Sequence, residues 1–271
     1  MQKRNLTLIW LLILNLFTWT APSAWAAPVS LDQNIKAILA KQAEIRNGFD
    51  FVVLGDSRDG ADVYARLLTR TGSLHPLFII HTGDFVKSGD PVEYENYIKQ
   101  IAAVNIPIVH LPGNHDVRTG PEPYRQYVGE PNWYFDLGDI RFIGLDNGSG
   151  KFTPEAVALA RETLTNQKTC LVAFHYPPAV GRWGVHAMIA DQKGGQGGLV
   201  MDLIKKAKAP LVFLGHIHLY DEMAINGTRY IITAGGGAEL YSRYNFGKPE
   251  YGFVLVQVRP QGITHRWVPL D

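Results

Sequence analysis

The 271-residue sequence has one cysteine, almost no net charge and no long uninterrupted apolar run. A single thiol, Cys170, cannot form an intrachain disulfide, so packing, with or without help from bound metal, must stabilise the fold. The formal net charge is +1 and there is no basic tract, which argues against a surface that coats nucleic acid. Hydrophobic residues make up 46% of the chain, which is enough for a sizeable core.

The first 26 residues have the features of a cleaved secretory signal peptide. Lys3 and Arg4 precede an apolar run over residues 6–17, and residues 24–26, Ala-Trp-Ala, have the small side chains that signal peptidase prefers. A retained anchor is the alternative, but the uninterrupted apolar part is shorter than the roughly 20 residues of a spanning helix. Cleavage after Ala26 removes two positive charges and no acids, which changes the net charge from +1 to −1. We therefore expect an exported protein without a membrane span, periplasmic if its source is a Gram-negative bacterium.

The remaining chain is predicted to form one domain over residues 49–271, preceded by a peripheral helix within residues 27–48. Apolar residues recur at helical spacing from about residue 31 to residue 47, and Ser30 is a plausible N-cap. Short apolar runs that end in turns predict buried strands at 51–54, 77–80, 106–111, 171–174 and 211–214. Helices are expected between them, at 61–71, 91–104, 153–166 and 199–207.

Three pairs of apolar segments joined by short turns predict antiparallel hairpins. They are 134–137 with 141–145, 221–225 with 230–234, and 253–258 with 263–268. A chain that combines hairpins with strand–helix–strand crossovers commonly stacks two mixed sheets with helices outside, so we expect an α/β fold. The longest irregular segment, residues 176–198, could be a mobile cover over a small-molecule pocket.

Polar residues with metal-ligating side chains stand at the carboxyl ends of the predicted strands. In α/β sheets this edge is where ligands bind. A glycine directly before several of these residues would let the backbone turn sharply there. The candidates are Asp56, Asp84, Asn114, His115, Asp116, His175, His216 and His218, and the glycines are Gly55, Gly83, Gly113 and Gly215.

This set of side chains predicts a two-metal centre. Histidine with carboxylate and no thiolate suits zinc, manganese or iron. Two aspartates, an asparagine and three histidines are too many for one open catalytic metal, and they suit two ions that share a carboxylate. Such pairs clamp the attacking and leaving oxygens of a phosphoryl displacement, so hydrolysis of a phosphate ester is the expected reaction.

The candidates belong to five blocks that occur in order along the chain. They are Gly55-Asp56-Ser57-Arg58, Gly83-Asp84, Gly113-Asn114-His115-Asp116, His175 and Gly215-His216-Ile217-His218. Together they resemble the signature of the calcineurin-like metallophosphoesterase superfamily, which includes purple acid phosphatases and class III cyclic nucleotide phosphodiesterases. The resemblance extends over the chain from Phe49 onward, and it implies a four-layer αββα sandwich of two mixed β-sheets flanked by helices.

The resemblance also implies a ligand set for two ions of manganese, iron or zinc. Asp84 would bridge the ions, and a hydroxide held between them would attack phosphorus in line. One site would be completed by Asn114, His175 and His216, and the other by Asp56 and His218.

Two neighbouring residues would act on the substrate, a small phosphomonoester or phosphodiester. The resemblance implies that His115 binds phosphate or acts as a general acid, and that Asp116 orients its imidazole and raises its basicity. A fold that binds phosphate or nucleotide but has lost turnover is the alternative function, and retention of this pair argues against it. The sequence does not indicate an oligomeric state.

One position departs from the family pattern. Arg58 stands where the family usually has a histidine ligand of the first metal, and a guanidinium offers no lone pair. Purple acid phosphatases use a tyrosine three residues after the bridging aspartate instead, but this chain has Lys87 there. In the preferred interpretation Asp56, Asp84 and His218 still hold the first metal, more weakly, and Arg58 clamps the substrate phosphate. In the other, that site is empty or exchangeable and Arg58 supplies its positive charge.

Overall fold

The computed structural model describes residues 30–184 and 195–271. The predicted signal peptide, residues 1–26, lies outside the described residues, as does the middle of the predicted cover, residues 185–194. Within the described ranges, no helix is long and apolar enough to cross a bilayer. The helices are α1 (Leu31–Ala40), α2 (Ala61–Gly72), α3 (Pro91–Ile101), α4 (Glu122–Tyr127), α5 (Pro154–Thr163), α6 (Gln196–Ala207) and the short 3₁₀ helix η1 (Gly181–Trp183).

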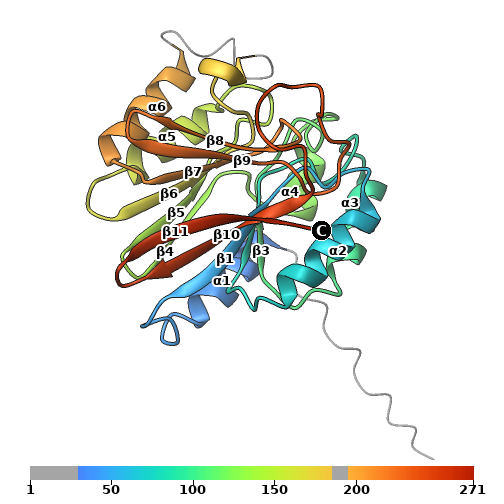
Figure 1. Cartoon of the computed structure of the whole chain (residues 1–271), viewed down its shortest axis with the longest axis horizontal. Helices are drawn as coiled ribbons and strands as arrows, with labels where there is room; N and C mark the ends of the chain where they lie inside the picture. Colours follow the sequence, from blue (N-terminus) through green and yellow to red (C-terminus); the bar gives the residue numbers. More distant parts are fainter. Residues whose placement is uncertain (1–29, 185–194) are drawn as a thin grey trace, which may run out of the picture.

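The strands form two mixed sheets (Figure 1). They are β1 (Phe49–Leu54), β2 (Ile79–His81), β3 (Ile108–His110), β4 (Trp133–Leu137), β5 (Ile140–Gly144), β6 (Thr169–Ala173), β7 (Leu211–Leu214), β8 (Tyr220–Ile225), β9 (Thr228–Thr233), β10 (Gly252–Arg259) and β11 (Gly262–Pro269). The first sheet has the order β11-β10-β1-β2-β3 and the second the order β4-β5-β6-β7-β9-β8. In the first sheet the parallel strands β1, β2 and β3 lie on one side and the antiparallel hairpin β10–β11 on the other. In the second sheet four parallel strands form the centre, and β4 and β8 pair antiparallel at the two edges.

Three apolar layers hold the sheets and helices together. The layer between the sheets contains four phenylalanines with no exposed surface, Phe51, Phe78, Phe142 and Phe213. The Phe51 ring stacks on Phe78 at 5.1 Å between centroids and meets the edge of Phe142 at 5.2 Å. One outer layer joins the first sheet to α2 and α3, and the other joins the second sheet to α5 and α6 (Figure 1). The expected sandwich of two mixed sheets between helices is therefore confirmed.

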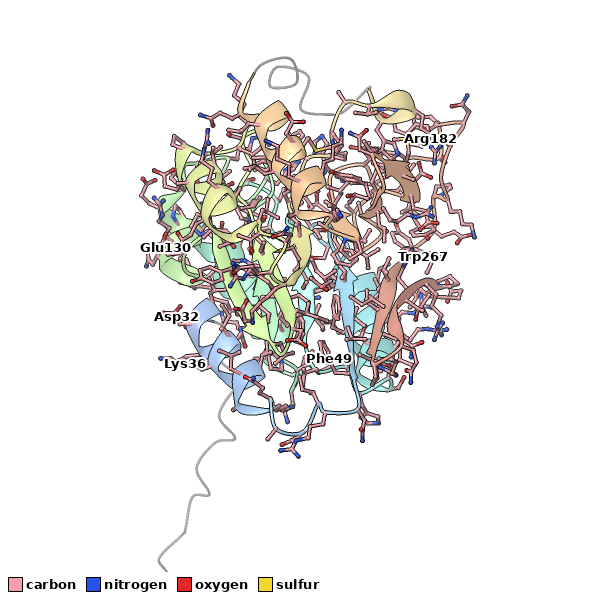
Figure 2. The ribbon with its side chains drawn as sticks, turned by 90° about the vertical axis from the view of Figure 1, so that its left-hand side faces the viewer. Asp32, Lys36, Phe49, Glu130, Arg182 and Trp267 are labelled. Atoms are coloured by element: carbon pink, nitrogen blue, oxygen red, sulfur yellow. The ribbon has the colours of Figure 1, made fainter. Side chains whose placement is uncertain are left out.

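The N-terminal helix is shorter than the sequence pattern suggested. Ser30 caps α1 by accepting a hydrogen bond from the Gln33 N–H at 3.3 Å, as expected, but the helix ends at Ala40 and not near residue 47. Residues 41–47 are mostly exposed, and a helical turn without packing is marginal in water. Asp32 and Lys36 lie on the outer side of α1 (Figure 2), while its buried residues cover the edge at β3.

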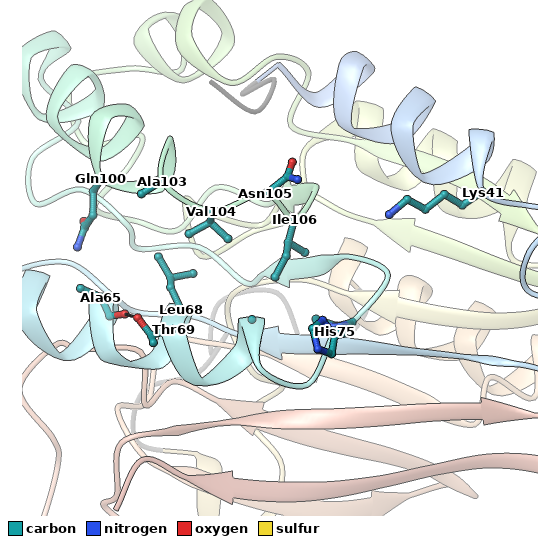
Figure 3. A pocket seen from close by; sticks show the side chains of 12 residues that line it. Lys41, Ala65, Leu68, Thr69, His75, Gln100, Ala103, Val104, Asn105 and Ile106 are labelled. Atoms are coloured by element: carbon teal, nitrogen blue, oxygen red, sulfur yellow. Dashed lines mark hydrogen bonds between the residues drawn. The ribbon is translucent and has the colours of Figure 1, made fainter. Parts of the chain in front are cut away.

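A cavity of about 580 Å³ opens between α2 and α3 (Figure 3). Its lining includes His75 and Asn105, which stand before the amino ends of β2 and β3. This is the edge opposite to the one where the candidate ligands follow the strands, and none of those candidates lines the cavity. It is therefore not the predicted site.

Truncating a phenylalanine between the sheets should destabilise the fold strongly. We expect Phe51→Ala to lower the free energy of unfolding by about 3–5 kcal/mol, because it leaves a cavity in a fully buried aromatic cluster. Val92→Ala, at a side chain that is 64% exposed on α3, should change it by less than about 0.5 kcal/mol. Urea denaturation followed by circular dichroism measures both, and equal losses would contradict this account of the core.

Candidate metal centre

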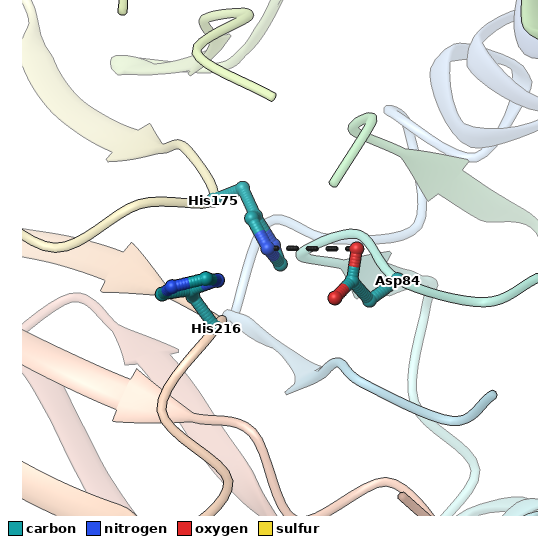
Figure 4. A group of neighbouring side chains, drawn as sticks. All are labelled: Asp84, His175 and His216. Carbon is teal, nitrogen blue, oxygen red and sulfur yellow. Dashed lines mark ion pairs between the residues drawn. The ribbon is translucent and has the colours of Figure 1, made fainter. Parts of the chain in front are cut away.

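The predicted ligands converge although they come from both sheets. The side chains form two groups, in each of which one ligand atom per residue lies within 4.8 Å of the others. They are Asp84 with His175 and His216, and Asp56 with Asp84 and His218. Asp84 belongs to both groups, as a bridging residue must. Figure 4 shows the first group, in which His175 Nε2 lies 3.6 Å from Asp84 Oδ1.

Asn114 adds an amide oxygen to the first group. Its Oδ1 lies 3.2 Å from His175 Nε2 and 3.0 Å from His216 Nδ1. Two imidazole nitrogens, a carboxylate and an amide oxygen then surround one point, a donor set that suits zinc, manganese or iron. These four residues fit one metal ion.

Backbone carbonyls fix which ring nitrogen of two histidines faces the site. His175 Nδ1 lies 2.8 Å from the Thr82 carbonyl oxygen, and His218 Nδ1 lies 2.7 Å from that of Glu239. Because a carbonyl only accepts, each Nδ1 donates and each Nε2 keeps its lone pair. Burial disfavours protonation of His218, but the hydrogen bond and charge of Asp56 outweigh it and raise the pKa of this imidazole.

Three of the ligands have a left-handed backbone. The φ angles are +60° at Asp56, +59° at Asp84 and +72° at His216, a region that costs free energy for residues with a side chain. Of the four glycines expected to let the backbone turn sharply, only Gly83 has a left-handed backbone itself, with a φ of +100°. At Gly55, Gly113 and Gly215 a Cβ atom would collide with Thr82, Asp84 and Asp56, so these glycines permit close packing instead.

Asp116 does not orient His115 as the sequence suggested. Its fully buried carboxylate accepts four backbone N–H groups: those of Asp84 at 2.7 Å, Gly113 at 2.8 Å, and Phe85 and Val86 at 3.0 Å. Burial and the nearby charge of Asp84 raise the pKa of Asp116, and the four donors oppose that shift because they stabilise the anion. Asp116 thus joins the loop after β2 to the loop after β3.

A backbone carbonyl takes the place of that carboxylate beside His115. The His115 Nδ1 atom lies 2.6 Å from the Lys87 carbonyl oxygen, so it donates and Nε2 is the ring atom left to exchange a proton. The His115 backbone N–H donates to Asp84 Oδ1 at 2.9 Å. This places His115 next to the bridging carboxylate, and its side chain is only partly buried.

Arg58 lies against the other oxygen of Asp84. Its Nε is 3.7 Å from Asp84 Oδ2, and its Nη1 donates to Asp59 at 2.8 Å. Asp59 also pairs with Lys87, whose Nζ is 3.2 Å from Asp59 Oδ1. A chain of alternating charges therefore runs from the ligand Asp84 to the protein surface.

Sequence reasoning missed three residues that support the ligands. Asn147 accepts the His175 N–H through its side-chain oxygen at 2.8 Å and so holds the end of that strand. The Tyr176 ring lies against His216 in a tilted contact at 3.8 Å between centroids, and the Tyr241 ring stacks on His218 at 4.4 Å. Asn147 follows β5 at the same sheet edge as the ligands, and that position is the signal that could have identified it.

Two other histidines near the site are buried and do not face the metal positions. His81 Nε2 bonds Ser57 at 3.1 Å, and His110 Nε2 bonds Tyr97 at 2.9 Å. Burial lowers the pKa of His110 to about 3 and holds that of His81 well below its ordinary value. Both remain neutral, as expected of hydrogen-bonded core histidines.

The described part of the predicted cover is fixed to the second sheet. The buried Trp183 donates to Asp221 at 2.7 Å, and Arg182 forms a two-pronged ion pair with the same carboxylate at 2.7 and 2.9 Å. Asp221 belongs to β8. The rest of the predicted cover includes the residues outside the described ranges, so a lid stays a prediction.

Known structures share this fold. A purple acid phosphatase from yellow lupin seeds superposes on 83% of the chain and 52% of its own length, with a TM-score of 0.68 and 14% identity. A dimetal phosphatase from Danio rerio covers 83% of the chain and 97% of its own length, with a TM-score of 0.62 and 11% identity. At such identities the likeness concerns the fold alone.

Curated relatives are similar in sequence over part of the chain. The 3',5'-cyclic adenosine monophosphate phosphodiesterase CpdA of Escherichia coli K12 is 28% identical over 169 residues, which are 57% of this chain and 59% of CpdA. A probable glycerophosphodiester phosphodiesterase, GpdQ of Arcobacter nitrofigilis, is 26% identical over 161 residues, 53% of this chain and 57% of GpdQ. The chain thus matches less than two thirds of either relative.

A match to a family model extends over more than half of the chain. The model described as calcineurin-like phosphoesterase matches residues 49–220, a range that includes every predicted metal ligand and the strands that present them. The expectation drawn from the five sequence blocks is confirmed. This chain belongs to the calcineurin-like phosphoesterase family.

Proposed function

We propose that the chain is an exported, metal-dependent hydrolase of small phosphodiesters. The observation that carries the proposal is the carboxylate of Asp84, which belongs to two groups of ligand atoms and has His115 beside it. The two curated relatives bear the names of phosphodiesterases, which favours a diester over a monoester. Export is supported by the pattern of residues 1–26.

Each part of the site contributes a separate step to such a reaction. Asp84, Asn114, His175 and His216 would hold a metal ion, which supplies Lewis acidity and an activated water when bound. Arg58 can donate N–H groups to the phosphate oxygens and offset their charge. His115, held through Nδ1 by the Lys87 carbonyl, can give a proton from Nε2 to the leaving oxygen.

Loss of the shared carboxylate should abolish turnover. Asp84→Ala should lower kcat/KM for bis-p-nitrophenyl phosphate more than about 100-fold. A loss of about 100-fold is the largest expected when a residue only supports a metal ligand. Asp32→Asn, at an exposed position on α1, is the matched control and should match wild type. If wild type loaded with manganese or zinc is no faster than Asp84→Ala, the chain is a binding protein. Faster hydrolysis of p-nitrophenyl phosphate would refute the diester preference.

A general acid at His115 predicts a dependence on the leaving group. His115→Gln should slow release of an alkoxide by about 100-fold or more, because an alkoxide needs a proton to leave. Release of p-nitrophenolate, a much weaker base, should slow less than about tenfold. Steady-state kinetics on an alkyl and an aryl diester give the comparison, with exposed His75→Gln as control. Equal slowing of both esters would leave His115 only a phosphate-binding role.

Export predicts a defined mature N-terminus. The chain produced in a Gram-negative host should be recovered from the periplasm beginning at Ala27, as read by intact-mass spectrometry. Ala26→Phe should block processing because the residue before the cut must be small, whereas Ala21→Phe should not. Uncleaved wild-type chain in the cytoplasm would contradict export and leave the proposed chemistry untouched.

A further inference from the structure

The two oxygens of the Asp84 carboxylate face different partners. Oδ1 accepts the His115 N–H at 2.9 Å and lies 3.6 Å from His175 Nε2, on the side of the group completed by Asn114 and His216. Oδ2 lies 3.7 Å from Arg58 Nε. That Nε is buried and makes no hydrogen bond to any described residue. The guanidinium therefore lies beside the Asp84 oxygen that faces away from His175, next to the group of Asp56, Asp84 and His218.

Arg58 is held in this place from both sides. Its backbone N–H donates to the Asp84 carbonyl at 3.0 Å, and its Nη1 donates to Asp59 at 2.8 Å. Asp59 also pairs with Lys87 at 3.2 Å. Only 16% of the Arg58 side chain is exposed, so it has little room to swing away. Position 58, where the family usually has a histidine ligand, and position 87, where purple acid phosphatases have a tyrosine ligand, thus both carry cations, Arg58 and Lys87.

The remaining members of the second group already have partners within the protein. Asp56 accepts the His216 backbone N–H with both oxygens, at 3.0 and 3.1 Å, and its Oδ1 lies 3.4 Å from His218 Nε2. The carboxylates of Asp56 and Asp84 therefore both have positive or N–H neighbours without an ion. A dication placed between them would gain three ligands but would lie close to a fixed guanidinium, where like charges repel strongly because the site is shielded from water.

We propose that this centre holds one tightly bound divalent ion, at Asp84, Asn114, His175 and His216, and that the Arg58 guanidinium serves as its second cation. Asp56 and His218 then support the loops of the site and do not ligate a resident metal. A guanidinium is a permanent cation with several N–H donors, so this side of the centre would bind phosphate oxygens directly. The claim that this phosphate belongs to a substrate rests on the proposed function, whereas the number of bound ions is independent of it.

Counting ions tests the inference without reference to activity. Metal-free protein is dialysed against Mn²⁺ at about ten times the dissociation constant of the first ion, and bound manganese is measured by elemental analysis. Wild type should hold one ion per chain. Arg58→His, which removes the cation and restores a ligand, should hold two, with the second bound at least about a hundredfold more tightly than in wild type. Lys87→Met, which removes the more exposed neighbouring cation, should still hold one.

A spectroscopic signal gives an independent count. Two Mn²⁺ ions that share a carboxylate are magnetically coupled, so Arg58→His should show a coupled electron paramagnetic resonance spectrum and wild type that of isolated Mn²⁺. Should Arg58→His fail to fold, Arg58→Met removes the charge alone and should still tighten the second ion. Two equally tight ions in wild type, or one ion in every folded Arg58 variant, would overturn the inference. Two ions with diester turnover would leave the proposed function intact, whereas one ion without turnover would overturn only that function.

Discussion

Four backbone N–H groups that converge on the Asp116 carboxylate hold the centre of this molecule together. They come from the loop after β2 and from the loop after β3, so one buried anion fixes two loops that belong to neighbouring strands. Asp84 lies in the first of these loops with a left-handed backbone, a conformation that costs about 1–3 kcal/mol and persists only where the surroundings enforce it. Without this anchor, the Asp84 carboxylate would have no fixed direction.

The rest of the fold supports the same end of the sheets. Parallel strands from both sheets finish at one edge, and the phenylalanines between the sheets pack behind that edge. Ligands that closely follow the strands of a packed sandwich are placed more rigidly than ligands on long free loops. The glycines beside them permit loops from the two sheets to approach, since Gly113 adjoins His175 and Gly215 adjoins Asp56. The centre is thus formed by the contact of two sheets.

Much of this arrangement could be predicted from the sequence, because the positions of strands and hairpins depend on short local patterns. The strand at 211–214 was predicted with its observed bounds, and the hairpins were placed within a few residues. The N-terminal helix was predicted too long because its periodicity continues beyond the part that packs. Asp116 was misassigned for another reason: adjacency in sequence suggested His115 as its partner, whereas the folded chain offers it four N–H groups. Hydrogen-bond partners depend on loop geometry, which no motif contains.

The carbonyl partners of the three imidazoles have a consequence for how this protein can diverge. His115, His175 and His218 are oriented by the main chain at Lys87, Thr82 and Glu239, and not by any side chain there. Substitutions at the exposed Lys87 and Glu239 can therefore accumulate without changing which ring nitrogen faces the site, whereas the Thr82 side chain is itself fully buried. An insertion or deletion in the same loops would displace the carbonyl itself. The centre should tolerate drift in residue identity and resist change in loop length.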